Sequence, residues 1–574
     1  MKKLLVYLRG NIKECVLAPL FKLLEAIFEL FVPLIMATII DQGIGGHNEA
    51  LVWRYGLYLL LLAAVGLVSA ITAQFFAARA ATSCSTRLKG ALLRHIYSLS
   101  FKQTDGISVP TLITRMTSDV NQVQSGVNMA LRLLLRSPFI VFGAMVMAFT
   151  VDATAALVFA VIIPVLSVIV ALILKKTLPG YRQIQRASDA VLGATRENLT
   201  GVRVIRAFGR EQSEEERFRE KHDALTTLQI KIQRISAVLN PLTLLLIDIA
   251  LAVLIYVGAV RVNIGVLTQG QVVALTNYMS QILVELVKLA NLLITLTRAM
   301  ACASRVESIL DVEPDMLSGN EEPNWNEENL VVLDHASASY EGVGKEALSD
   351  ITLTLKKGHT LGVIGGTGSG KSTFASLIPR FYDTSAGNVL VGGKNVKVLS
   401  LEALRQGIGV VPQKALLFRG TIRDNLLMGD RSADDETLIS ALKTAQAFDF
   451  VNELPDKLDA PVEQNGKNFS GGQRQRLTIA RALVRKPHIL ILDDSASALD
   501  AQTDARLRKA IREDVKDAAV IIISQRASSV MHLDQILVLD DGKAVGLGTH
   551  EELMKTCPVY QETYEAQFPK EVRA

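Results

Sequence analysis

The sequence predicts two domains of different fold class: an α-helical membrane domain with six transmembrane helices and long cytoplasmic extensions, followed by an α/β domain. Three observations predict this. At 574 residues the chain exceeds one domain. Apolar runs of membrane-spanning length fill the chain before about residue 310, whereas charged residues and glycines are mixed in after it. In the second part, a glycine-rich loop lies between a strand-like and a helix-like segment.

Six segments have the roughly 20 mostly apolar residues that a helix needs to cross a bilayer core. Because six is even, both chain ends lie on one side. The long segments after the second and fourth spans are rich in Lys and Arg, which places them and both termini in the cytoplasm by the positive-inside rule. The expected location is therefore the cell membrane, as a multi-pass protein of a bacterial plasma membrane. The spans are about 15–40, 54–79, 131–151, 154–176, 240–262 and 272–297.

The two long connections, 80–130 and 178–238, carry apolar residues at helical spacing among charges, which predicts helices that continue out of the membrane. Each contains a break where a short crosswise helix is expected. The first break is Ser108-Val109-Pro110-Thr111-Leu112 and the second runs from Gly201 to Phe208.

Composition divides the chain into a membrane domain at 1–310, a linker at 311–329 and a second domain at 330–574. The linker is acidic and contains Pro314, Gly319 and Pro323. The net charge of +4 and the lack of a basic tract argue against a nucleic-acid partner. Four scattered cysteines support neither a disulfide framework nor a zinc site. The short basic N-terminus lacks a small-residue cleavage site, so an uncleaved first span is expected.

The strongest motif follows the apolar strand 360–364 and precedes the helical pattern 374–378. Glycines let backbone N–H groups surround phosphate oxygens, and the helix N-terminus adds a positive dipole end. Lys371 can reach the β- and γ-phosphates, and Ser372 can bind Mg²⁺. The pattern predicts an α/β P-loop nucleotide-binding domain that takes ATP and Mg²⁺. The motif residues are Gly365, Gly366, Thr367, Gly368, Ser369, Gly370, Lys371, Ser372 and Thr373.

A second apolar strand, 489–492, ends in the carboxylates Asp493 and Asp494. The first would hold Mg²⁺ through water, and the second would orient an attacking water. Many strands end in aspartate, so the pattern gains its meaning from the phosphate loop in the same domain.

Phe469-Ser470-Gly471-Gly472-Gln473 resembles the signature motif of ABC transporters, which ordinary phosphate-loop enzymes lack. Six spans with two cytoplasmic excursions resemble the exporter-type membrane domain of that family, so the resemblance covers essentially the whole chain. It implies further roles. Tyr340 resembles the residue that stacks on adenine, with a packed core tyrosine as the alternative. Gln413 resembles the glutamine loop that contacts Mg²⁺, Ser497-Ala498-Leu499-Asp500 resembles the D-loop, and Glu197 through Phe208 resembles the second coupling helix.

The chain departs from the family pattern at two positions. The family's catalytic glutamate is replaced by Asp494, one methylene shorter, and its switch histidine by Gln525, which cannot exchange a proton in the same way. Drift can explain either change alone. Both fall on one ATP site and weaken hydrolysis rather than binding, which favours a slow site.

In the family, ATP lies between the phosphate loop of one subunit and the signature motif of the other. The resemblance therefore implies a heterodimer with a second ABC half-transporter. This chain would supply a weakened phosphate-loop side to one site and Ser470, Gly471, Gly472 and Gln473 to the partner's competent site. Bacterial heterodimeric multidrug exporters are similar.

Charged residues occur inside the predicted spans: Lys22, Glu25 and Glu29 share one helix face, and Asp248, Glu285 and Lys288 lie in later spans. Such residues usually face a bundle interior or a water-filled cavity. One interpretation is an anionic cavity for small lipophilic cations; the other is internal Lys–Glu pairing.

The expected function is ATP-driven export of a lipophilic substrate, drugs first, with lipid or peptide export as the alternative. A non-transporting, nucleotide-gated regulator is the rival from another class. Membrane lipid is a further expected partner.

Overall fold

The structure is a computed structural model that describes residues 4–340, 346–495 and 498–568. The chain forms two compact units. The first holds the residues up to Ile96 together with Val109–Val312, and the second holds Tyr97–Ser108 together with the residues from Glu313 onward. The short segment Tyr97–Ser108, which the sequence assigned to the membrane domain, thus packs with the second unit.

Helices dominate the first unit, and six of the helical stretches among its described residues are long and apolar enough to cross a membrane. This confirms the predicted number of spans. The helices extend beyond the apolar segments, because they continue as polar helix. The stretches are Val6–Ile44, Glu49–Ser98, Val109–Val151, Ala153–Thr200, Glu211–Asn263 and Gln269–Leu310. Their α-helices are α1 (Ile12–Thr38), α2 (Glu49–Ser98), α4 (Val109–Thr114), α5 (Val120–Leu133), α6 (Arg136–Val151), α7 (Ala153–Thr200), α9 (Glu211–Ala237), α10 (Leu239–Asn263) and α11 (Gln269–Leu310).

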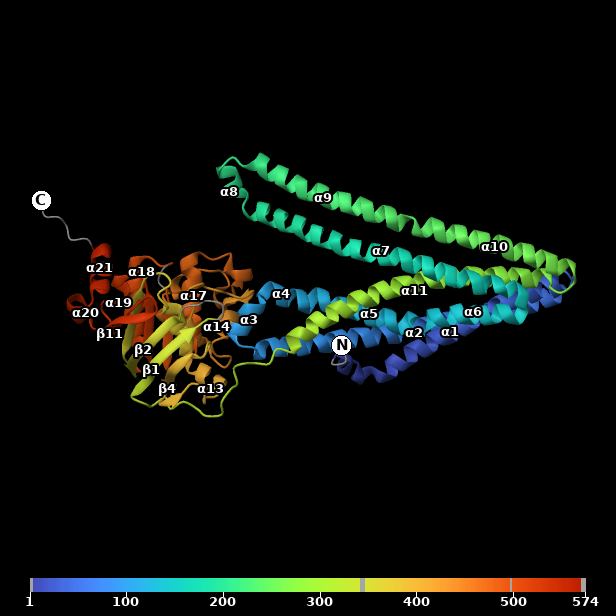
Figure 1. The fold of residues 1–574 in the computed structure, drawn as a ribbon. Coiled ribbons are helices and arrows are strands. Elements are labelled where there is room, and N and C mark those ends of the chain that lie inside the picture. Colours follow the sequence, from blue (N-terminus) through green and yellow to red (C-terminus); the bar gives the residue numbers. More distant parts are fainter. Residues whose placement is uncertain (1–3, 341–345, 496–497, 569–574) are drawn as a thin grey trace. The chain divides into compact units, whose positions relative to one another are not determined.

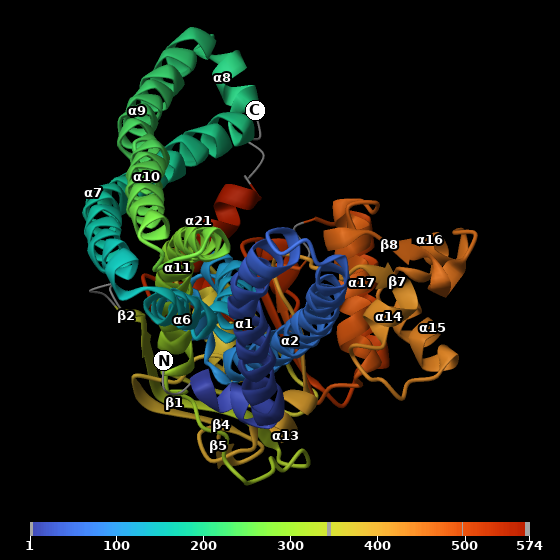
Figure 2. The ribbon, with the colours of Figure 1, turned by 90° about the vertical axis from the view of Figure 1, so that its right-hand side faces the viewer.

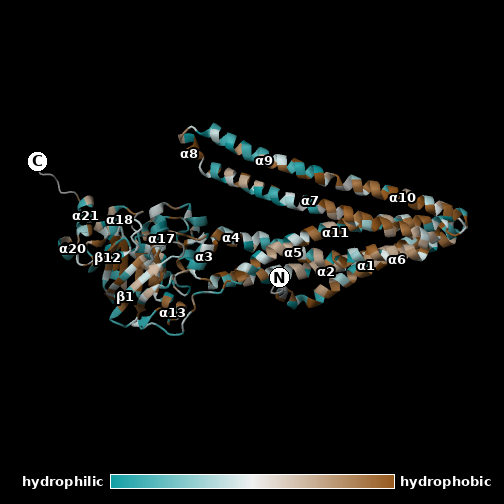
Figure 3. Cartoon of the chain, viewed as in Figure 1, coloured by the Kyte–Doolittle hydropathy of each residue, from teal (hydrophilic) through white to brown (hydrophobic). Residues whose placement is uncertain are grey.

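The fourth and fifth spans form a long arm. α7 packs along α9, and α8 (Val202–Ala207) joins them at the far end, where the second short helix was expected (Figures 1 and 2). Hydropathy changes along this arm: α10 and the first part of α7 are apolar, whereas α9 and the second part of α7 are largely polar (Figure 3). The arm therefore combines membrane-spanning helix with a long polar extension that ends in α8.

The first short helix lies elsewhere than predicted. It is α3 (Phe101–Ile107), which ends at Ser108, a residue with a positive φ of 71°. Ser100 caps α3 by accepting a hydrogen bond from the Gln103 N–H, and the Gln103 side chain bonds back to the Ser100 N–H. Pro110 lies in the first turn of α4, where its missing N–H costs nothing. The proline therefore starts the next helix instead of marking the crosswise one.

The second unit is built on a ten-stranded mixed sheet in the order β5-β4-β1-β2-β12-β11-β3-β10-β9-β6. From β11 to β6, each strand runs parallel to its neighbour. All six residues of β10 are buried, as expected where helices cover both faces of a parallel sheet. The strands are β1 (Asn329–Ser339), β2 (Glu346–Lys356), β3 (Thr360–Gly365), β4 (Ala386–Val391), β5 (Lys394–Asn395), β6 (Ile408–Val411), β9 (Ile489–Asp493), β10 (Ala519–Ser524), β11 (Gln535–Asp540) and β12 (Lys543–Gly548).

The helices of this unit include α12, which follows β3, and α17, which packs against α14, α15 and β6. The small pair β7 (Gly420–Thr421) and β8 (Pro461–Val462) completes the unit. The predicted linker pairs with the unit, because the Glu321 N–H donates to the Val398 carbonyl over 3.2 Å. The helices are α12 (Lys371–Leu377), α13 (Leu401–Gln406), α14 (Ile422–Leu426), α15 (Asp435–Thr444), α16 (Phe448–Asn452), α17 (Gly471–Val484), α18 (Ala501–Asp514), α19 (Ala527–Val530), α20 (His550–Thr556) and α21 (Pro558–Gln567).

Five of the six charged residues predicted in the spans, all except Asp248, form an ion cluster around Arg136, a residue that the sequence analysis did not single out. The Arg136 guanidinium lies 2.5 Å from Glu285 and 2.6 Å from Glu29, and 3.8 Å from Glu25. Lys22 and Lys288 complete the cluster, at 2.5 Å from Glu25 and 2.8 Å from Glu285. Three cations thus face three carboxylates. The structure favours internal pairing over an anionic cavity, and Asp248 is exposed on α10.

Candidate nucleotide site

The carboxyl ends of the parallel strands meet at one edge of the sheet, and most of the predicted site residues lie there. The phosphate loop follows β3, Asp493 is the last residue of β9, and Gln525 follows β10. Gln413 lies two residues beyond the end of β6. Because β6, β9, β10 and β3 are neighbours in this order, residues separated by more than 100 positions in sequence converge at this edge. Ligands of open α/β sheets bind at this edge.

The glycines of the phosphate loop are needed at specific places. Gly370 has a φ of +96°, and a Cβ there would lie 2.5 Å from the Ala347 carbonyl oxygen. A Cβ on Gly365 would lie 2.1 Å from the Leu539 carbonyl oxygen. At Gly366 and Gly368, in contrast, no atom lies within 4 Å of a built Cβ. The loop is therefore tightly fixed at both ends and open in between, as a phosphate cradle requires.

Lys371 is buried at the first turn of α12, and its ammonium group folds back onto the loop. It donates to the carbonyl oxygens of Gly365 over 2.9 Å and Gly366 over 2.6 Å. Burial lowers the pKa of Lys371, and the charges of Asp494 and Asp493 oppose this decrease. The Ser369 hydroxyl accepts a further hydrogen bond from this ammonium group over 3.4 Å. A buried cation held by neutral oxygens favours an anion in the cradle.

Ser372 and Asp493 are brought into hydrogen-bond contact. Burial raises the pKa of the Asp493 carboxyl, the hydrogen bond from Ser372 and the charge of Lys371 oppose this, and the neighbouring Asp494 adds to the increase. A bound divalent cation would reverse the effect of burial. Hydroxyl, amide and carboxylate oxygens are the hard ligands that Mg²⁺ prefers, so Ser372, Gln413 and Asp493 fit this metal.

Asp494 is linked to the glutamine loop. The Gln413 amide donates to the Asp494 carboxylate over 3.3 Å, and both residues lie at the same edge of the sheet. Asp494 has a positive φ of 45°, and its N–H donates to the Ile523 carbonyl on β10. The backbone at this position is thus fixed by the neighbouring strand.

Tyr340 lies just beyond the end of β1 and contacts the phosphate-loop helix. Its hydroxyl lies 3.1 Å from the Thr373 hydroxyl, and its ring packs edge-on against Tyr382 at a centroid distance of 5.2 Å. The residue is half-buried. This position suits a ring that stacks on a base bound beside the cradle.

The signature residues form the N-terminus of α17. Ser470 is the cap: its hydroxyl accepts from the Gln473 N–H over 3.2 Å, and the Gln473 side chain accepts from the Ser470 N–H over 2.9 Å. Among the described residues, the contact of a Cβ added to Gly471 is with Ala498 Cβ, at 4.0 Å. Gly472 follows in the first turn. The free N–H groups of this turn can bind an anion.

Gln525, which follows β10, and Asp500, which precedes α18, are two further residues that the sequence predicted for the site. Gln525 is exposed, and its carbonyl accepts from the Gln567 side chain over 2.8 Å. In the expected D-loop, Ser497 lies outside the described residues. Asp500 caps α18 by accepting from the Thr503 N–H over 2.8 Å.

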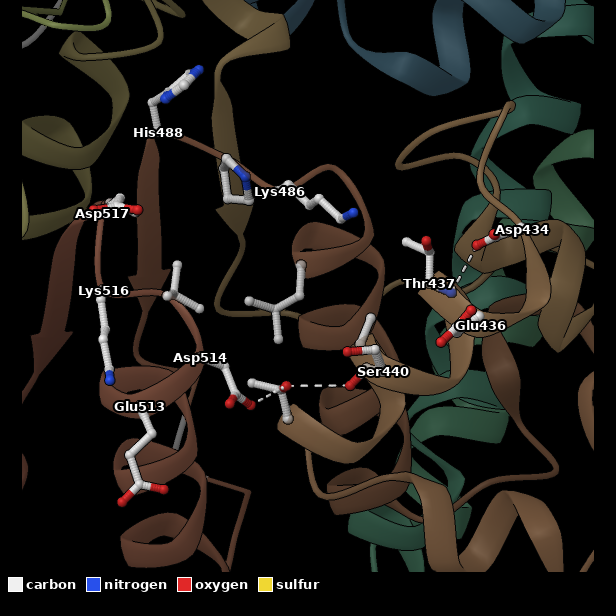
Figure 4. Close-up of a pocket in the computed structure, with 16 residues that line it drawn as sticks. Asp434, Glu436, Thr437, Ser440, Lys486, His488, Glu513, Asp514, Lys516 and Asp517 are labelled. Carbon is white, nitrogen blue, oxygen red and sulfur yellow. Dashed lines mark hydrogen bonds between the residues drawn. The ribbon is translucent and has the colours of Figure 1, made fainter.

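A pocket of this unit lies at a different place. It has a volume of about 860 Å³ and is shown in Figure 4. Its lining residues His488 and Lys516 precede β9 and β10, so the pocket opens at the amino ends of these strands. The phosphate loop lies at the opposite edge of the sheet. The pocket is therefore distinct from the candidate nucleotide site.

Comparison with known proteins agrees with the geometry. Residues 15–286 match the family description "ABC transporter transmembrane region", and residues 348–497 match "ABC transporter". The chain belongs to the ABC transporter family. Its ABC transmembrane region is fused to an ABC ATP-binding domain, which is the architecture of an exporter half-transporter, and this confirms the predicted family and fold class. The second match covers the phosphate loop, the signature and both aspartates, whereas Tyr340 and Gln525 lie outside it.

Several relatives match nearly the whole ABC exporter chain. An uncharacterised ABC transporter ATP-binding protein of Mycobacterium bovis is 36% identical over 95% of this chain and 94% of its own. A probable multidrug resistance ABC transporter ATP-binding/permease protein of Bacillus subtilis is 31% identical, with 99% and 97% covered. An ATP-dependent lipid A-core flippase of Sodalis glossinidius is 30% identical, with 96% and 95% covered.

A solved structure of a bacterial Atm1-family ABC exporter with ATP bound has the same fold, with a TM-score of 0.81. The match covers 99% of each chain at 22% sequence identity.

Sequence reasoning missed two groups of residues. Arg136 has a signal, because it is one of two arginines, with Arg132, at the start of the apolar segment 131–151. Asp105 and Tyr382 carry no such signal in the sequence. They contact one another, but they lie 277 residues apart in the chain.

Proposed function

We propose that the chain is one subunit of a heterodimeric exporter that uses ATP to move a lipophilic substrate out of the cell. One observation carries this proposal: the phosphate loop, two strand-end carboxylates and a glutamine converge at one edge of the sheet, in a chain with six spans. ATP binding and the membrane domain together support active transport, whereas a nucleotide-gated regulator would not need a complete signature at the N-terminus of α17.

In the proposed site, Lys371 and the loop N–H groups bind the phosphates, and Tyr340 stacks on adenine. Ser372, Gln413 and Asp493 hold Mg²⁺, which supplies charge neutralisation when bound. Asp494 orients the attacking water, but its carboxylate is one methylene shorter than the family's glutamate and is engaged by Gln413. Gln525 cannot take up a proton as histidine does. We therefore propose that this site hydrolyses ATP slowly.

Exposed apolar residues at the tip of the arm support the proposal that a second ABC half-transporter binds this chain. At this tip, Leu199, Val204 and Phe208 expose 72%, 60% and 76% of their surface. Apolar side chains gathered at the end of a polar arm favour a protein partner. In the proposed pair, α8 docks on the partner's ATP-binding domain, and Ser470 to Gln473 complete the partner's competent site.

The proposed substrate is a small lipophilic molecule, with drugs first and a lipid or peptide as the alternative. The named relatives support both a drug and a lipid as substrate, since one is a probable multidrug transporter and another a lipid A-core flippase. The ion cluster around Arg136 has no excess negative charge, so it gives no support for a preference for cations. We place the chain in the cell membrane, with both termini in the cytoplasm. Substrate movement by the co-expressed pair in vesicles, dependent on ATP, would distinguish a transporter from a regulator.

Replacing Lys371 by alanine should reduce ATP binding to this subunit at least tenfold. Among the described residues of the loop, Lys371 is the only cation, and the substitution removes it. Labelled-ATP cross-linking to this subunit measures the effect. Lys516→Ala, which removes an exposed lysine before β10 at the opposite edge of the sheet, is the control. Unchanged occupancy in Lys371→Ala would show that the phosphate loop is wrongly assigned.

Restoring the family's residues by Asp494→Glu together with Gln525→His should change the turnover of the pair less than about threefold, because the chemistry runs at the partner's phosphate-loop site. The dwell time of ATP on this subunit should shorten. Single-turnover release of labelled ATP and steady-state ATPase rates measure the two quantities. A large increase in steady-state turnover would contradict the proposed asymmetry.

A further inference from the structure

A continuous set of contacts joins α3 to the phosphate-loop helix within the second unit. The Tyr382 hydroxyl donates to the Asp105 carboxylate over 2.8 Å. The ring of Tyr382 packs against the ring of Tyr340 at 5.2 Å with an interplanar angle of 82°. The Tyr340 hydroxyl lies 3.1 Å from the Thr373 hydroxyl on α12. Each link is a hydrogen bond or an edge-to-face ring pair within normal geometry.

The segment α3 is well fixed on this unit by other contacts. The ring of Phe101 lies 4.8 Å from that of Phe381, the residue before Tyr382. The Gln103 amide donates to the Glu313 carbonyl over 2.7 Å. These contacts hold α3, so that Asp105 is presented to the Tyr382 hydroxyl. Since α3 follows the membrane-spanning helix α2 in the chain after two residues, it is covalently joined to the membrane unit.

Tyr382 can act only as a donor in this arrangement. Burial raises the pKa of its phenol, and the hydrogen bond to Asp105 adds to this increase. The hydroxyl therefore keeps its proton at physiological pH, and the bond to a carboxylate is charge-assisted. The hydroxyl oxygen lies on the long axis of the ring, so its hydrogen bond to Asp105 fixes where that axis points, and the edge-to-face packing against Tyr340 fixes the plane of the ring. The face that Tyr340 can offer to a base is set by that ring.

We propose that Tyr382, held by Asp105, is a positioning residue that orients Tyr340 for the adenine ring and couples base binding to the docking of α3. This inference rests on the proposed function, in which Tyr340 stacks on adenine. By linkage, a nucleotide that needs the oriented ring stabilises the Asp105–Tyr382 contact, and loss of that contact weakens nucleotide binding equally. The coupling passes through the base and leaves the phosphates untouched.

The test uses the full-length pair in lipid nanodiscs and compares ATP with inorganic tripolyphosphate, which lacks a base. Tyr382→Phe keeps the ring and removes the hydroxyl, and Asp105→Ala removes the acceptor. Each should weaken ATP binding to this subunit about fivefold, the usual net effect of one hydrogen bond. The double variant should be no weaker than either single variant, because both break the same contact. Asp105→Asn keeps an acceptor oxygen and should bind ATP nearly as wild type does.

Two further readouts separate positioning from a general structural role. The inhibition constant of tripolyphosphate, measured by its competition with ATP for this subunit, should be unchanged in every variant. ATP at saturation should slow amide hydrogen exchange in 101–107 in the wild type but not in Tyr382→Phe. Tyr564→Phe, which removes a phenolic hydroxyl from α21 in the same unit, is the matched control and should behave as wild type.

The outcomes are distinguishable. Additive losses in the double variant, or an equal weakening of tripolyphosphate, would overturn the inference, because the variants would then disturb the fold or the cradle. Unchanged ATP affinity in Tyr382→Phe, with binding that still depends on Lys371, would overturn the inference alone. Absence of Lys371-dependent ATP binding in the wild type would overturn the proposed function together with it.

Discussion

Replacing Gly471 by alanine should lower the steady-state ATPase rate of the pair about a hundredfold, the usual cost of losing one transition-state donor. Gly471 is the first residue of α17 and lies beside the cap Ser470. In the proposed pair, the N–H groups of this turn contact the γ-phosphate in the partner's site. A methyl group at this position would occupy the space between these donors and the phosphate.

This substitution is a clean probe because it should leave the fold of this chain intact. Among the described residues outside its own helix turn, a Cβ at Gly471 comes no closer than 4.0 Å to any atom, which is ordinary van der Waals contact. Alanine is also the better helix former by about 1 kcal/mol. Ser470→Ala is less specific, since it removes the capping hydrogen bond to Gln473 and costs about 1 kcal/mol of helix stability. Comparing the two variants separates the loss of the cap from the loss of the phosphate contact.

The measurement is the ATPase rate of the purified pair, with thermal unfolding of each variant beside it. Gly193→Ala is the matched control, because Gly193 is exposed in helix α7 and nothing lies within 4 Å of a built Cβ. A Gly471→Ala pair that hydrolyses ATP as fast as wild type, together with brisk hydrolysis by this chain alone, would overturn the heterodimer. Asp494 would then serve as the base in a homodimer.

The sequence predicted those features that depend on neighbours in the chain. The phosphate loop needs only the spacing of glycines and Lys371 between a strand and a helix, and this local pattern also fixed the edge of the sheet at which the site lies. The spans were predicted from apolar length alone. The error at α3 was also local: the capping pair Ser100 and Gln103 was present in the sequence, but the short helix was expected in the break at 108–112.

Contacts between distant positions could not be predicted in this way. Arg136 bonds to Glu29, 107 residues away, and to Glu285, 149 residues away. No periodicity links these positions, because the packing of α1, α6 and α11 brings them together. The same holds for Tyr382 and Asp105. The sequence showed that charges lie in the spans, and only the fold shows that they balance.

The second large effect is expected in the membrane unit. Replacing Arg136 by alanine should destabilise the chain by about 3–5 kcal/mol, because it leaves carboxylates without their shared cation. Arg136 is 6% exposed and Glu285 is 2% exposed. Glu285 would keep the Ser137 hydroxyl at 2.8 Å and Lys288, whereas the Glu29 carboxylate would lose its ion pair with Arg136.

Thermal unfolding of the purified protein in nanodiscs measures this loss. Arg54→Ala, at an exposed arginine near the start of α2, is the control and should unfold as wild type. Replacing both Arg136 and Glu285 by leucine should recover much of the stability, because a buried pair exchanged for apolar side chains is often neutral. Such recovery would show that the two residues act as one unit.

The same variants decide between pairing and substrate binding. If the cluster positions helices, Arg136→Ala should lose transport of cationic and neutral dyes to the same extent, in proportion to the loss of folded protein. If Glu25, Glu29 and Glu285 instead bind substrate, removing the competing guanidinium should raise the apparent affinity for cationic dyes without changing thermal stability. The short distances from Arg136 to Glu29 and Glu285, and the equal numbers of cations and carboxylates, lead us to expect the first result.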